Sequence, residues 1–291
     1  MTVHRELKTL SVEDETALRD FLSPHEASSM FLLANAHAAG LVDRGQPLQG
    51  TYVAAIEEGE WIGVAAHFWN GMLVLQAPRP QTLEPVARAA LLRSGRTLSG
   101  LAGPRAQVDA ALSALDLEGR RASLDSREKL YDLALDDLRV PDALASGRLL
   151  CRRPRPGELD LLAEWRAEFS IESLGVTDGD DLRAVSRAEL ARQNADGVVW
   201  IAVDGDRPVS HTAFNARIPG VVQVGGVWTP PALRGRGYAK CAVAGSLLDA
   251  RRNGAKRAVL FTAEENAPAR AAYEALGFRV IGDYGLVIFS P

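Results

Sequence analysis

The feature that most constrains the fold is a turn rich in glycine and arginine between an apolar strand and an amphipathic helix. The turn reads Arg234-Gly235-Arg236-Gly237-Tyr238-Ala239. Residues 221–229 before it have the pattern of a strand, and residues 237–252 carry apolar side chains at helical spacing. A strand that passes through a short turn into a helix is typical of a sheet covered by helices, so an α/β fold is expected.

The chemistry of this turn suits an anion. Glycines at positions 235 and 237 permit unusual backbone angles and a close approach to the backbone. Successive N–H groups of such a turn, together with the positive end of the following helix, form a site for phosphate oxygens. Arg234, Arg236 and Lys240 add positive charge. Taken alone, however, the turn is as readily interpreted as a solvated loop.

A second segment has the signals of a short, well-delimited helix. Asn266 is a favourable N-cap, Pro268 fits the first turn, and Gly277 ends the helix. By themselves these residues indicate only a capped surface helix, in which Tyr273 is an aromatic residue of the core.

The two segments together resemble the GNAT superfamily of N-acyltransferases. Residues 234–239 are similar to the family's pyrophosphate loop, Gln/Arg-x-x-Gly-x-Gly/Ala. Residues 266–273 are similar to its second motif, Asn-x-x-Ala/Ser-x-x-x-Tyr, and Leu-Gly-Phe follows at 276–278. The motifs stand in the family's order, and the resemblance covers about half of the chain.

The resemblance implies acetyl-CoA as co-substrate and an amine-bearing acceptor. Backbone groups of Val227 and Thr229 would pair with pantetheine, and backbone N–H groups of residues 236–240 would hold the pyrophosphate. Asn266 would contact the pantetheine arm. The residues expected to bind the co-substrate are Val227, Trp228, Thr229, Arg234, Gly235, Arg236, Gly237, Tyr238, Ala239, Lys240, Asn266 and Ala269.

Two catalytic roles follow from the chemistry of acetyl transfer. The resemblance places Tyr273 near the thioester sulfur, where a phenol can donate a proton to the leaving thiolate. Glu172, on the first helix of the C-terminal half, is the candidate general base. His211 and the pair Glu264–Glu265 remain alternatives, as does a relayed water.

The chain is long enough for two domains, and its halves have similar orders of elements. Residues 1–140 and 148–291 are expected to form two GNAT-like domains, each a mixed, mostly antiparallel central sheet flanked by helices. The first half lacks both motifs, and Pro78 and Pro80 remove N–H donors where a cradle would need them. It is therefore interpreted as a degenerate domain that does not bind CoA. Residues 280–289 are expected to close the C-terminal sheet.

The composition of the chain argues against several classes of function. The net charge of −4 is unlike that of a nucleic-acid binder, and the two cysteines have no metal-ligand spacing. No apolar run reaches the length of a membrane span, so a cytoplasmic protein without a metal, monomeric or homodimeric, is expected. The sequence leaves two alternatives to a simple acetyltransferase: a non-catalytic acyl-CoA sensor and a tandem-GNAT synthase of the mycothiol synthase kind.

Overall fold

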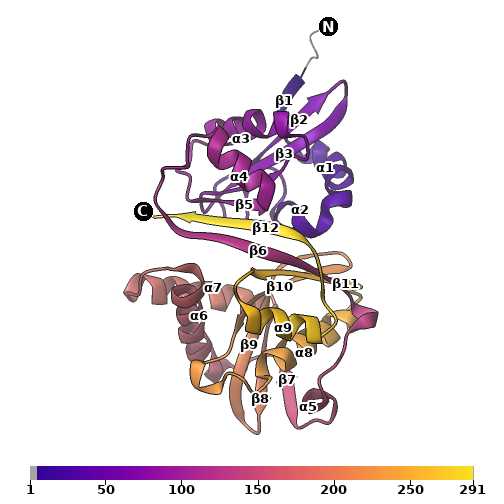
Figure 1. Cartoon of the computed structure of the whole chain (residues 1–291), viewed down its shortest axis with the longest axis vertical. Helices are drawn as coiled ribbons and strands as arrows, with labels where there is room; N and C mark the ends of the chain where they lie inside the picture. The colour runs from indigo at the N-terminus through magenta and orange to yellow at the C-terminus, as the bar shows by residue number, and fades with distance from the viewer. Residues whose placement is uncertain (1–4, 291) are drawn as a thin grey trace. The chain divides into compact units, whose positions relative to one another are not determined.

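A computed structural model describes residues 5–290 of the chain (Figure 1). It divides into two compact units. Of the described residues, the N-terminal unit contains 5–130 together with 282–290, and the C-terminal unit contains 131–281. The chain therefore passes from one unit to the other twice. No helix among residues 5–290 is both long and apolar enough to span a membrane.

The N-terminal unit is a sheet with helices on both faces. Its strands lie in the order β1-β2-β3-β4-β5-β12. Helices α3 and α4 pack on one face, and α1 and α2 lie on the other (Figure 1). Its elements are β1 (Arg5–Thr9), α1 (Glu15–Leu22), α2 (Met30–Ala39), β2 (Gly50–Glu57), β3 (Glu60–Phe68), β4 (Met72–Gln76), α3 (Pro80–Ser94), β5 (Gly100–Pro104), α4 (Arg105–Ala114), the first part of β6 (Ala122–Ala134) and most of β12 (Arg279–Phe289).

The C-terminal unit has the same layered arrangement. Its strands lie in the order β11-β10-β9-β8-β7, with α6 and α7 on one face and α8 and α9 on the other (Figure 1). Its elements are α5 (Asp142–Ala145), β7 (Leu149–Arg152), α6 (Leu159–Leu174), α7 (Asp180–Ala195), β8 (Val199–Asp204), β9 (Arg207–Ile218), β10 (Val221–Trp228), α8 (Tyr238–Arg252), β11 (Arg257–Ala263) and α9 (Ala267–Ala275).

The expected fold class is confirmed, since each unit has a mixed, mostly antiparallel sheet flanked by helices. One detail differs from expectation. The strand expected to close the C-terminal sheet, β12, instead pairs over Tyr284–Ile288 with β5 of the N-terminal unit. Alternation along a strand predicts its conformation but does not identify its partner, because pairing joins residues far apart in the chain.

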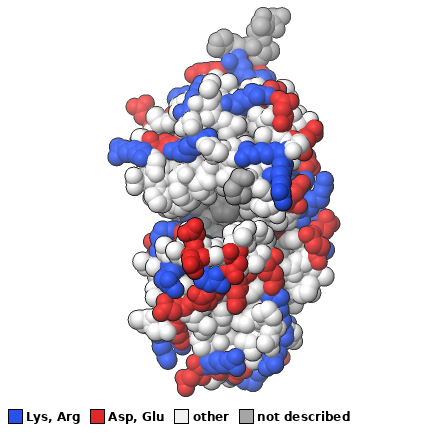
Figure 2. All heavy atoms as spheres, turned by 90° about the vertical axis from the view of Figure 1, so that its left-hand side faces the viewer, with Lys and Arg blue, Asp and Glu red and all other residues white. Residues whose placement is uncertain are grey.

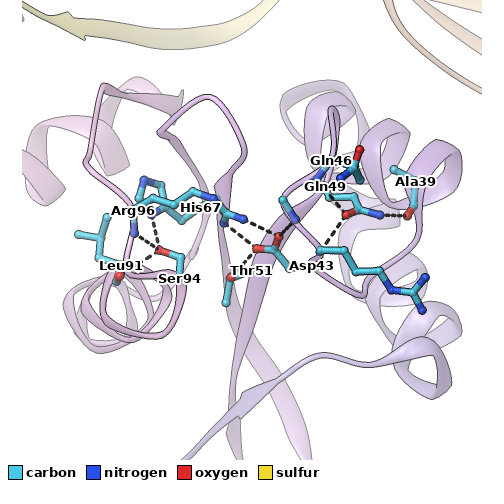
Figure 3. Close-up of polar contacts among 11 residues, drawn as sticks. Ala39, Asp43, Gln46, Gln49, Thr51, His67, Leu91, Ser94 and Arg96 are labelled. Carbon is cyan, nitrogen blue, oxygen red and sulfur yellow. Dashed lines mark hydrogen bonds and ion pairs between the residues drawn. The ribbon is translucent and has the colours of Figure 1, made fainter.

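A polar network fixes the loop that follows α2 in the N-terminal unit (Figure 3). Arg96 donates two hydrogen bonds to Asp43, of 2.6 and 2.5 Å, and a third of 3.3 Å to the carbonyl of His67. Asp43 also accepts from the Thr51 hydroxyl and the Gly45 N–H. The hydrogen bonds from Arg96 are the largest cause that lowers the pKa of Asp43 to about 2.

We expect this network to stabilise the protein at neutral pH. A carboxyl group that is more acidic when folded than when unfolded stabilises the fold above its unfolded pKa of about 3.9, and this contribution is lost as the pH falls toward 2. Replacing Arg96 with Met should therefore lower the free energy of unfolding by about 2 kcal/mol at pH 7, and by much less below pH 3. Urea denaturation at several pH values measures the difference.

The matched control is Arg19→Met, which removes an exposed i,i+4 pair with Glu15 at 3.6 Å. Such surface pairs contribute less than about 0.5 kcal/mol. Equal stability losses for the two variants, or a loss for Arg96→Met that does not vary with pH, would contradict a role for the Asp43 ion pair.

Candidate active site

Strand β10 of the C-terminal unit, which lies between β11 and β9, separates from β11 partway along its length. The two strands pair in parallel only from Val221 to Gln223, although both continue for several residues. On its other side, β10 pairs with β9 through two register shifts, the second between Gly225 and Trp228. Gly226 within this bulge has a φ of 56°. Beyond Gln223 the backbone of β10 is no longer paired with β11, and we call this break in the pairing the opening between the two strands. An extended ligand can pair with strand backbone at such a place.

The glycine turn lies between the end of β10 and the start of α8. Gly235 and Gly237 have φ angles of 78° and 80°, which are accessible to glycine at low cost. Gly237 is the N-cap of α8, and no side chain caps that end of the helix. The first N–H groups of a helix have no acceptor within the helix, so this end offers several donors to an anion. The turn therefore offers backbone donors to an anionic group such as a phosphate.

Some side chains beside this turn stabilise the fold, and others can supply positive charge to a ligand. Tyr238 is buried, and its hydroxyl donates to Asp204 at 2.7 Å, so it can offer a phosphate only its backbone N–H. Arg236 is exposed, and Lys240 is half-buried. Hence the side chains that can supply charge are those of the arginines and Lys240, while the backbone supplies the cradle.

The structure brings Glu172 next to the turn, although 62 residues separate it from Arg234. Arg234 Nη2 donates to Glu172 Oε2 at 2.9 Å, and Arg234 Nε donates to the Thr229 carbonyl at 3.0 Å. The guanidinium also lies 4.8 Å from the centre of the Trp228 ring. Both members of the ion pair are about half exposed, so solvent screens it and a phosphate can replace the carboxylate.

Helix α9 carries the second motif, and its Tyr273 belongs to the same apolar cluster as Val224 of β10 and Leu260 of β11. Asn266 Oδ1 accepts from Ala269 N–H at 3.2 Å and so caps the helix. Tyr273 is buried, and its ring lies near those of Tyr131 and Phe278, with centroids 6.4 and 6.0 Å away. These contacts fix where the phenol of Tyr273 lies.

Sequence reasoning missed Tyr131 and Glu168. The Tyr131 hydroxyl donates to Glu274 at 2.9 Å and accepts from Arg270 Nε at 3.3 Å, which secures α9. Trp228 Nε1 donates to Glu168 Oε2 at 3.2 Å, one helical turn before Glu172 on α6. The spacing of Glu168 and Glu172 was visible in the sequence, but the contact of Glu168 with Trp228 depends on the fold.

The remaining base candidates are placed differently. Glu264 and Glu265 are both exposed at the end of β11. His211 is buried on β9, where its ring stacks on Trp165 with 6.0 Å between centroids. Burial, and next the positive charge of Arg166, lower the pKa of His211 to about 3. At neutral pH His211 is therefore an uncharged imidazole and too weak a base to act as the general base.

Other features of the C-terminal unit do not add to this site. A depression of about 490 Å³ is lined only by residues 177–182, between α6 and α7, and contains none of the predicted site residues. Among residues 5–290, no group of three or more His, Cys, Asp or Glu side chains is arranged to hold a metal ion. The face that α6 and α7 form carries many acidic side chains (Figure 2), and arginines of α7 pair with several of them.

Comparison with known proteins agrees with this geometry. Residues 159–278 match the model of the acetyltransferase (GNAT) family. A Drosophila protein shares the fold with a TM-score of 0.66, 13% identity and 98% coverage of both chains. For a GCN5-related N-acetyltransferase from Sphaerobacter thermophilus, the TM-score is 0.57 at 18% identity, with 97% of this chain and 94% of that chain covered.

A tandem GNAT protein from the clavulanic acid biosynthesis pathway is also similar, with a TM-score of 0.53, 14% identity and 99% of each chain covered. At these identities the likeness is one of fold. No curated protein sequence matches the chain significantly. GNAT proteins are in general N-acetyltransferases that use acetyl-CoA. Residues 159–278 thus form a domain of the GNAT acetyltransferase family, and the chain over its whole length shares the fold of GNAT proteins, a tandem GNAT protein among them.

Proposed function

We propose that the C-terminal unit transfers the acetyl group of acetyl-CoA to a primary amine by direct attack of the amine on the thioester. The observation that carries this proposal is the opening between β10 and β11 next to the uncapped, glycine-lined start of α8. The strand backbone suits pantetheine and the helix start suits pyrophosphate, so one extended ligand would use both.

The proposed roles follow from where each group lies. The amine nitrogen forms a bond to the acetyl carbon, the carbon–sulfur bond breaks, and the thiolate needs a proton. Tyr273, on α9 beside the opening, is proposed to donate that proton. Glu172, on α6 beside the turn, is proposed to accept the proton that the amine loses, directly or through water. Its ion pair with Arg234 would open when Arg234 turns to a phosphate.

For the N-terminal unit we propose a supporting role without CoA binding. Its β4 and β5 also pair in parallel over three residues, Met72–Val74 with Gly100–Ala102. Beyond them, however, the Ala77 N–H donates to Gln107 Oε1 at 2.7 Å, so the protein itself occupies that backbone donor. Helix α3 begins with Pro80, which has no N–H to offer a phosphate.

Amine-dependent release of CoA tests the proposal. Purified protein with acetyl-CoA and a panel of primary amines should release free thiol only when an acceptor amine is present, and mass spectrometry should detect the acetamide product. If acetyl-CoA binds but no amine gives turnover, the non-catalytic sensor replaces the transferase.

A further inference from the structure

Two hydroxyl groups of β9 bond to backbone carbonyls of β10 at its bulge. Ser210 Oγ donates to the Trp228 carbonyl at 2.8 Å, and Thr212 Oγ1 donates to the Gly225 carbonyl at 3.4 Å. Both hydroxyl-bearing residues are fully buried. A bulge interrupts the regular hydrogen bonds between two strands, and these hydroxyls supply donors to the bulged strand.

Ser210 belongs to a chain of three hydrogen-bonded groups. The Thr229 hydroxyl donates to Ser210 Oγ at 2.9 Å, and Ser210 donates in turn to the Trp228 carbonyl. A hydroxyl has a single proton, and the bond received from Thr229 directs the Ser210 proton to the carbonyl. Because the bond from Ser210 is much shorter than the one from Thr212, Ser210 is the stronger constraint on the bulge.

The direction of the Trp228 carbonyl sets the direction of the next N–H. The atoms of a trans peptide lie in one plane, and its C=O and N–H point in opposite directions. All peptide bonds of the described residues are trans. Since the Trp228 carbonyl bonds to a residue of β9, the N–H of Thr229 points away from β9, toward the side on which β10 has separated from β11.

The carbonyl of Thr229 is held by a second side chain. It accepts from Arg234 Nε at 3.0 Å, so the carbonyl already has a partner and the N–H is the group that Thr229 offers to a ligand. Ser210 and Arg234 thus fix Thr229 from the peptide groups before and after it. An N–H whose direction is fixed in advance loses little freedom when a ligand binds to it.

We infer that Ser210 is a positioning residue for the co-substrate: through the Trp228 carbonyl, it directs the N–H of Thr229 at the pantetheine arm of acetyl-CoA. This inference rests on the proposed acetyl-CoA site. Thr229 lies between the opening and the turn at 234–239, so pantetheine is the part of the ligand that would pass it. Ser210 itself is fully buried, contacts no ligand and moves no proton.

Two ligands separate this role from a general loss of structure. Acetyl-CoA has both the pantetheine arm and the pyrophosphate, whereas 3′-phospho-ADP has the pyrophosphate without pantetheine. Ser210→Ala removes the hydroxyl that holds the Trp228 carbonyl, so it should raise the Kd for acetyl-CoA about tenfold. The Kd for 3′-phospho-ADP should not change. Calorimetric titration of the whole protein measures both constants.

Ser246→Ala is the matched control. Ser246 on α8 is also fully buried, and its hydroxyl donates to the Val243 carbonyl at 2.8 Å, the same distance as from Ser210 to Trp228. Each variant removes one buried hydroxyl, so both should lower Tm by a similar amount. Only Ser210→Ala should weaken acetyl-CoA binding.

Thr229→Val tests the chain of hydroxyls without changing Ser210. Valine is close to threonine in shape but cannot donate to Ser210 Oγ, so the Ser210 proton is no longer directed to the carbonyl. The variant should weaken acetyl-CoA binding about two- to threefold. Combined with Ser210→Ala it should have no further effect, because both changes act through the same carbonyl.

The outcomes distinguish failure of this inference from failure of the proposed function. Equal acetyl-CoA binding by Ser210→Ala and Ser246→Ala would overturn the role of Ser210, as would equal weakening of both ligands by Ser210→Ala. In either case, binding of acetyl-CoA by the wild type would leave the proposed function in place. If the wild type does not bind acetyl-CoA, the proposed function fails and the inference fails with it.

Discussion

Replacing Gly237 with Val should weaken acetyl-CoA binding at least about 100-fold. Gly237 has a φ of 80°, where a β-branched residue is strained, so the variant backbone would leave the geometry that the turn needs. Two or more N–H groups at the start of α8 would then no longer point toward the phosphate. Each hydrogen bond to a charged group contributes about 1.5–3 kcal/mol to the binding free energy, so their loss weakens binding. Calorimetric titration of wild type and variant with acetyl-CoA measures the effect.

The control for this experiment lies at the other end of the same helix. Gly254 also has a positive φ, of 92°, and nothing lies within 4 Å of a Cβ built there. Gly254→Val should carry similar backbone strain and bind acetyl-CoA as the wild type does. If the wild type itself fails to bind, the turn at 234–239 is an ordinary loop and the proposed function falls with it.

Replacing Tyr273 with Phe should lower kcat about 100-fold with little change in the KM for acetyl-CoA. The ring would keep its packing against Tyr131 and Phe278, so the variant removes only the hydroxyl. Loss of a general acid typically costs 10²–10⁴ in rate, because the leaving thiolate must then take its proton from water. Steady-state kinetics with a saturating amine give both constants.

Tyr131→Phe is the matched control, since it removes a hydroxyl from the neighbouring ring. That hydroxyl pairs with Glu274 and Arg270, so the variant should lose about 1 kcal/mol of stability and only a few-fold in kcat. Full turnover in Tyr273→Phe would exclude the phenol as the proton donor.

The sequence predicted those parts of the site that depend on neighbours along the chain. Gly235 and Gly237 take their backbone angles within one turn, and Asn266 caps α9 by accepting from the N–H of Ala269, three residues further along the chain. Both signals are therefore local. The α8 helix, expected from residue 237, begins at Tyr238 with Gly237 as its N-cap. Local rules of capping and periodicity suffice for such features.

The rest of the site depends on contacts between distant residues. Nothing near Glu172 in the sequence indicates that Arg234 will lie 2.9 Å away, and nothing near Trp228 indicates Glu168. The identification of Glu172 as a base from its place on the first helix of the C-terminal half remains a prediction.

The position of β12 in the sheet of the N-terminal unit affects how the chain folds during synthesis. Residues 284–288 complete the sheet of the N-terminal unit, and the side chains of Val287 and Phe289 lie in its core. The first unit to leave the ribosome therefore lacks the strand that lies between β5 and β6, and two core side chains, until residue 289 has emerged. Until then, the backbone of β5 on that side is unpaired, so the N-terminal unit cannot complete its fold before the rest of the chain is made. Residues 131–281 of the C-terminal unit are all synthesised before β12 is complete, so this unit can finish folding first.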